Sequence, residues 1–88
     1  MANSHFGLEG KRILVLGGGQ GMGEATAHLL SDLGASLALV DLELERAERV
    51  AADVAKKGVK AVPIAVDVTD DAAALAAIAR AERELGPL

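Results

Sequence analysis

The sequence predicts an α/β domain in which three parallel strands alternate with three helices. Three short, continuous apolar runs have the pattern of strands buried on both faces. Segments with helical spacing of apolar residues separate them, and strands joined in this way pair in parallel through right-handed crossovers. With 88 residues, 51% of them hydrophobic and 25% charged, the chain is one small ordered domain or a piece of one.

The three predicted strands are residues 12–16, 36–41 and 60–66. The first run ends directly in glycines, and the second ends in Asp41. Pro63 interrupts the third run, and proline cannot donate a hydrogen bond to a neighbouring strand. We therefore expect the third strand at an edge of the sheet.

Each predicted helix is indicated by the pattern of its apolar residues and by a glycine at its end. The first carries one apolar stripe and is followed by the capping residue Gly34; the stripe is formed by Met22, Ala25, Thr26, Leu29, Leu30 and Leu33. The second places charges opposite an apolar face and stops at Gly58; that face is formed by Ala47, Val50, Ala51 and Val54. The third is rich in alanine and runs to about Leu85, before Gly86.

Composition excludes several kinds of function. No cysteine is present, so disulfides and thiolate chemistry are excluded, and without tyrosine or tryptophan there is no tyrosine-based acid–base chemistry. A net charge of −4 repels polyanions, so we expect no nucleic-acid partner. No apolar run approaches the ~18–20 residues that span a bilayer, and no secretory signal is recognisable. We expect a cytoplasmic protein with a flexible leader over residues 1–10 and no metal site.

The most informative segment is the glycine-rich loop between the first strand and the first helix, residues 17–23. A helix N-terminus presents unpaired N–H groups and the positive end of the helix dipole, so it favours phosphate. Glycines let the backbone turn tightly and come close to a pyrophosphate. The alternative, a turn without a ligand, would be an entropically costly use of five glycines in seven residues.

The spacing of these glycines distinguishes between classes of phosphate loop. A P-loop needs a lysine after its last glycine, but Glu24 follows Gly23. The pattern G-x-G-x-x-G fails in every register, whereas G-x-x-x-G-x-G fits Gly17, Gly21 and Gly23. Alternating glycines also occur in methyltransferases, which usually carry an acid two residues before the first glycine, where this chain has Val15.

This spacing and the order of elements resemble the short-chain dehydrogenase/reductase family over residues 8–88. The family loop is usually T-G-x-x-x-G-[I/L]-G, and Leu16 stands in place of its threonine. The resemblance implies a Rossmann-like half of a doubly wound parallel sheet, with strand order 3-2-1. It also implies that Gly17 makes the turn, that Gly21 and Met22 approach the pyrophosphate, and that Gly23 lets the helix pack. We expect the other cofactor-binding positions of the loop at Gly19 and Gln20.

Asp41 ends the second strand 20 residues after Gly21. An acid at this place can accept hydrogen bonds from both ribose hydroxyls of the adenosine half and would repel a 2′-phosphate. Neither Gln20 nor Leu42, which also belongs to the predicted site, supplies a compensating base. The sequence therefore predicts NAD over NADP as cofactor. The alternative is that Asp41 is a solvated acid capping the next helix.

Asp67 and Val68 follow the third strand. The resemblance implies that Asp67 reaches the adenine amino group and that Val68 lines the ring. The alternative is a helix-capping role for Asp67, for which Thr69, Asp70 and Asp71 compete.

Family members catalyse hydride transfer with a Tyr-x-x-x-Lys pair, and this chain has no tyrosine. We expect residues 11–88 to be a partial NAD-binding domain, a fragment of an oxidoreductase acting on a small alcohol or carbonyl substrate. The fragment alone would be inactive, and the full-length parent would be a homo-oligomer. The alternative is a non-catalytic nucleotide-binding or assembly module that completes its sheet with another chain, because the first strand would have an unpaired edge.

Overall fold

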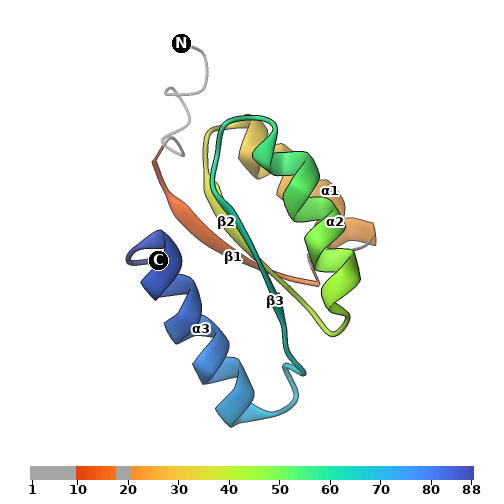
Figure 1. The fold of residues 1–88 in the computed structure, drawn as a ribbon, viewed down its shortest axis with the longest axis vertical. Coiled ribbons are helices and arrows are strands. Elements are labelled where there is room, and N and C mark those ends of the chain that lie inside the picture. Colours follow the sequence, from red (N-terminus) through yellow and green to blue (C-terminus); the bar gives the residue numbers. More distant parts are fainter. Residues whose placement is uncertain (1–9, 18–20) are drawn as a thin grey trace.

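The computed structural model describes residues 10–17 and 21–88. Three strands alternate with three helices (Figure 1), in the order β1 (Arg12–Leu16), α1 (Gly21–Asp32), β2 (Ser36–Asp41), α2 (Leu44–Ala55), β3 (Ala61–Ala65) and α3 (Asp71–Leu85). This is the predicted alternation. Of the predicted leader, residues 1–9 lie outside the described part of the chain.

The strands form one parallel sheet with β2 in the centre, so the predicted order is confirmed. Leu14 of β1 is paired with Ala38 of β2, which in turn is paired with Val62 of β3. In the sheet that the described residues form, β3 is an edge strand and tolerates Pro63, as predicted. β1 is the other edge strand.

Helices cover both faces of the sheet: α1 and α2 lie on one side and α3 on the other (Figure 1). Residues of β2 alternate between the two sides, because successive side chains of a strand point to opposite faces. Leu37 and Leu39 pack in the cluster with α1 and α2, whereas Ala38 and Val40 pack in the cluster with α3. The central strand is therefore buried on both faces. The same expectation for residues 12–16 is wrong: in β1 only Val15 is buried and Leu16 is 60% exposed, because β1 is an edge strand among the described residues.

The buried face of α1 differs from the predicted apolar stripe. Ala27 and Ser31 are the buried residues, while Met22 and Leu29 are 87% and 59% exposed. The small side chain of Ala27 fits against the sheet, and the Ser31 hydroxyl is satisfied because it donates to the carbonyl of His28 at 3.0 Å. The periodicity correctly indicated a helix, and Leu30 of the stripe packs partly buried against the core, but the fully buried residues are Ala27 and Ser31.

Two ion pairs hold α1 against the α2 side of the molecule. Arg49 of α2 lies 3.2 Å from the Glu24 carboxylate, and Lys57, just after α2, lies 2.9 Å from the Asp32 carboxylate. Such partly exposed pairs stabilise a fold only slightly. They join α1, which begins within the glycine-rich loop, to α2 and the residues that follow it.

Candidate functional site

A cavity of about 310 Å³ opens at the carboxyl ends of the strands. In open parallel sheets, ligands bind in the crevice at this end. All three strands or the segments that follow them contribute to the lining, which is formed by Gly17, Val40, Asp41, Leu42, Val66, Asp67, Val68 and Thr69. Five residues predicted from the sequence are thereby brought together: Gly17, Asp41, Leu42, Asp67 and Val68.

Gly17 forms the wall of the cavity that follows β1. Its φ of +69° lies in the left-handed region that favours glycine, and a Cβ there would meet no atom within 4 Å. The requirement for glycine is therefore conformational. Its N–H donates to the carbonyl of Val40 at 2.6 Å, which ties the start of the loop to the end of β2.

The other predicted loop residues have different positions. Gly21 is the first residue of α1 and has a φ of +55°. Met22 and Gly23 line a separate hollow between α1 and β1, together with Thr26 and Leu30. Gly19 and Gln20 lie outside the described residues.

Asp41 is a buried carboxylate in the wall of the cavity. It is only 5% exposed, and its Oδ1 accepts a hydrogen bond from the backbone N–H of Glu43 at 3.0 Å. Glu43, not Asp41, is the N-cap residue of α2, and its side chain makes no capping hydrogen bond. The alternative that Asp41 is a solvated helix cap is therefore wrong. Leu42 follows at the mouth of the cavity and is 70% exposed.

Asp67 lies across the cavity from the end of β2 and is held by Thr69. Its Oδ1 accepts hydrogen bonds from the Thr69 hydroxyl at 2.6 Å and from the Thr69 backbone N–H at 2.9 Å. The hydroxyl bond first and the backbone bond second hold the pKa of Asp67 below its ordinary value of 3.8, because both stabilise the ionised form. Asp70 caps α3, accepting from the N–H of Ala73 at 3.1 Å, so the capping alternative for Asp67 is wrong.

The electrostatics of this cavity follow from its lining. Two carboxylates, Asp41 and Asp67, face it, and none of the described lining residues is basic. Such a cavity suits hydrogen-bond donors such as hydroxyl and amino groups, and it disfavours a phosphate placed beside Asp41. Sequence reasoning treats Thr69 only as a possible helix cap. The signal that it misses is the spacing, because an aspartate side chain often accepts a hydrogen bond from the backbone two residues later.

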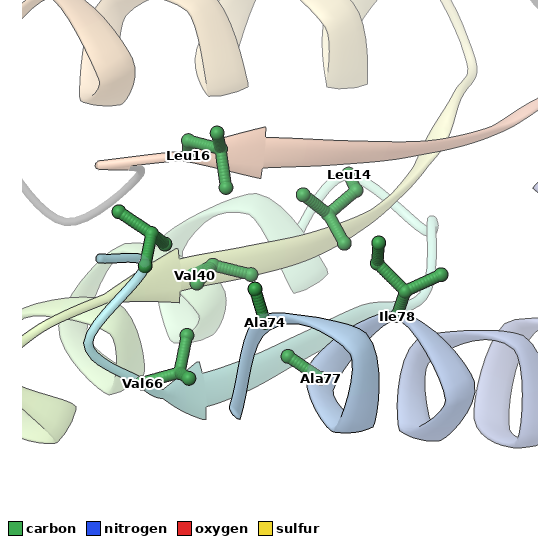
Figure 2. A pocket seen from close by; sticks show the side chains of 8 residues that line it. Leu14, Leu16, Val40, Val66, Ala74, Ala77 and Ile78 are labelled. Atoms are coloured by element: carbon green, nitrogen blue, oxygen red, sulfur yellow. The ribbon is translucent and has the colours of Figure 1, made fainter. Parts of the chain in front are cut away.

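A second, apolar pocket of about 200 Å³ adjoins the cavity and shares Val40, Val66 and Val68 with it. Figure 2 shows strand residues Leu14 and Leu16 on one side and residues of α3, including Ile78, on the other. Every lining residue is apolar, so the pocket offers no side chain for acid–base chemistry.

In the part of the chain that the structure describes, no group of three or more His, Cys, Asp or Glu side chains is placed to hold a metal ion. Among the helices of residues 10–17 and 21–88, none has the length and apolar character needed to cross a membrane.

Comparison with known proteins identifies the family. The sequence profile for short chain dehydrogenases matches residues 11–88. The chain belongs to the short-chain dehydrogenase family. The Bacillus subtilis 2,3-dihydro-2,3-dihydroxybenzoate dehydrogenase is 42% identical over 82 residues, which cover 93% of this chain and 31% of the relative. The Escherichia coli K12 5-keto-D-gluconate 5-reductase is 35% identical over 86 residues, which cover 98% of this chain and 34% of that one.

Solved structures of this family share the fold. A crystal structure titled NAD+-bound xylitol dehydrogenase superposes with a TM-score of 0.88 at 36% identity, covering 92% of this chain and 31% of that one. The citronellol catabolism dehydrogenase of Pseudomonas aeruginosa PAO1 gives a TM-score of 0.86 at 33% identity, covering 92% and 34%. This short-chain dehydrogenase sequence thus spans about a third of the length of the relatives it matches.

Proposed function

We propose that residues 11–88 bind the adenosine and pyrophosphate half of NAD, as the cofactor-binding part of an oxidoreductase. The observation that carries this proposal is the cavity at the carboxyl ends of the strands, where Asp41 and Asp67 meet beside the turn at Gly17. The two carboxylates fit an adenosine, because they accept hydrogen bonds from a ribose diol and from an exocyclic amino group. The similarity to an NAD+-bound xylitol dehydrogenase supports the same class of cofactor.

Each predicted residue has a role in this proposal. The backbone of Gly21 and Met22, at the start of α1, would hold the pyrophosphate, since unpaired N–H groups and the helix dipole favour an anion there. Gly19 and Gln20 would complete the loop, and Gly23 would let α1 approach β1. The bound dinucleotide supplies the hydride chemistry, and this part of the protein binds and orients it.

The preference for NAD over NADP rests on Asp41. A buried carboxylate that accepts both ribose hydroxyls would repel the charge of a 2′-phosphate. No lysine or arginine among the described lining residues offsets that repulsion. Leu42 and Val68 would flank the adenine ring with apolar side chains.

The parent reaction would be the oxidation of an alcohol or the reduction of a carbonyl in a small molecule. The names of the relatives, a dihydrodiol dehydrogenase and a keto-acid reductase, support this class. The 88 residues contain no tyrosine, so we expect no turnover from them alone. A cytoplasmic location and a homo-oligomeric parent belong to the same proposal.

The proposal is tested by following backbone amide NMR signals while ligand is added to the 88-residue chain. NAD and ADP-ribose should shift the same amides, those near Gly17, Leu42 and Val68, because both ligands carry the adenosine half. Nicotinamide mononucleotide, which lacks that half, should shift none of them. Equal responses to the mononucleotide and to ADP-ribose would contradict the assignment.

One observation favours a second candidate, a non-catalytic module that completes its sheet with another chain. Among the described residues β1 pairs only with β2, and Leu16 at its end and Ile78 of α3 are exposed. An unpaired apolar edge strand is a docking place for another strand. Native mass spectrometry separates the two candidates, because a compact monomer that binds NAD excludes the assembly module.

A further inference from the structure

Thr69 makes two hydrogen bonds to one oxygen of Asp67. The hydroxyl and the backbone N–H both donate to Oδ1, at 2.6 Å and 2.9 Å. Both residues line the cavity at the carboxyl ends of the strands. The carbonyl of Asp67 also accepts from the N–H of Asp70 at 3.0 Å, so the turn that carries both side chains is closed.

This arrangement orients the carboxylate as well as stabilising it. A side chain bonded twice through one oxygen loses rotational freedom, so its second oxygen, Oδ2, is held in one direction. An aspartate is ionised at neutral pH, and both bonds favour that form further, so Oδ2 is a hydrogen-bond acceptor and not a donor.

A fixed acceptor distinguishes two kinds of purine. The 6-amino group of adenine donates a hydrogen bond to a carboxylate, whereas the 6-oxo group of hypoxanthine or guanine presents lone pairs to it. A carboxylate that rotates freely, or that is protonated, loses part of this discrimination because it can adapt to the oxo group.

We propose that Thr69 is a positioning residue that makes Asp67 select an amino-purine over an oxo-purine in the bound dinucleotide. This inference rests on the proposed function, because it needs the adenine ring to lie in the cavity with Asp67. It adds to that function a residue, Thr69, that controls the selectivity for the base through Asp67.

The test compares NAD with nicotinamide hypoxanthine dinucleotide, which differs only at the purine, in the wild type, Thr69→Val and Thr69→Ser. Valine keeps the shape and the backbone donor but removes the hydroxyl, whereas serine keeps the hydroxyl. In Thr69→Val the preference for NAD should fall about three- to tenfold, which corresponds to one lost hydrogen bond. Thr69→Ser should keep the wild-type preference.

A second readout follows the ionisation of Asp67 through its side-chain carboxyl ¹³C signal. Thr69→Val should raise the pKa of Asp67 toward 3.8, because the larger of its two hydrogen-bond causes is removed. This pKa shift reports only that the hydroxyl bond to Asp67 has been removed, whereas a merely structural role for Thr69 would leave the base preference unchanged.

The possible outcomes separate the inference from the function. Either an unchanged preference or an unchanged pKa in a folded Thr69→Val would overturn the inference alone, as would equal wild-type affinities for the two dinucleotides. A wild type that binds neither dinucleotide would overturn the proposed function and the selectivity with it.

Discussion

Replacing Asp41 with asparagine removes one buried charge from the cavity with little change of shape. The asparagine side-chain oxygen can still accept the hydrogen bond that Asp41 Oδ1 receives from the Glu43 N–H at 3.0 Å. The fold around the end of β2 should therefore persist. If Asp41 binds the ribose as proposed, the change removes the negative charge that would repel a 2′-phosphate and the stronger, charge-assisted bond to the ribose diol.

The expected size of the effect follows from the position of Asp41. Like charges about 4 Å apart repel by about 1 kcal/mol in water and by about 4 kcal/mol at an effective dielectric constant of 20. Asp41 is only 5% exposed but faces an open cavity, so an intermediate value of about 2 kcal/mol is appropriate. NADP should bind roughly 30-fold more tightly to Asp41→Asn than to the wild type, since 1.4 kcal/mol is a factor of ten.

Fluorescence or NMR titrations of both cofactors measure this change as the ratio of the two dissociation constants. Glu43→Gln is the matched control, because it removes an exposed charge two residues away that does not line the cavity. An unchanged ratio in Asp41→Asn, or an equal change in Glu43→Gln, would refute the electrostatic argument for NAD.

The remaining predictions concern stability, measured by urea unfolding. Leu39→Ala should lower the free energy of unfolding by about 3 kcal/mol, because Leu39 is fully buried, whereas Leu75→Ala, at a 68% exposed position, should change it little; equal losses would contradict the assigned core. Asp70→Ala should cost about 1 kcal/mol by removing the α3 cap, and a neutral result would show that the cap does not stabilise the helix. Gly17→Ala should lower the free energy of unfolding by about 1 kcal/mol, because alanine disfavours a φ of +69°; the added Cβ itself meets no atom. An unchanged free energy of unfolding would mean that the turn adopts another backbone conformation.

Much of the fold could be predicted because local patterns and sheet geometry agree. The bounds of β1 and β2 follow from their continuous apolar runs, and Pro63 correctly indicated an edge strand. The buried face of α1 could not be predicted, because periodicity identifies an apolar side of a helix but not what covers it. The small residue Ala27 packs in the core, and the larger apolar residue Leu29 is exposed.

Part of the candidate site could be predicted from the geometry of a parallel sheet. Residues that follow parallel strands converge at one edge of the sheet, which is why Gly17, Asp41 and Asp67 meet. The burial of Asp41 and the bonds between Thr69 and Asp67 depend on backbone conformation after each strand, which the residue types alone do not specify.

The most direct test of the central claim is to locate the adenosine of bound NAD by intermolecular nuclear Overhauser effects. The account predicts contacts from the adenine protons to the methyl groups of Leu42 and Val68, which flank the mouth of the cavity. Contacts only to residues elsewhere, such as Ile64 and Ala73 in the hollow between β3 and α3, would contradict it.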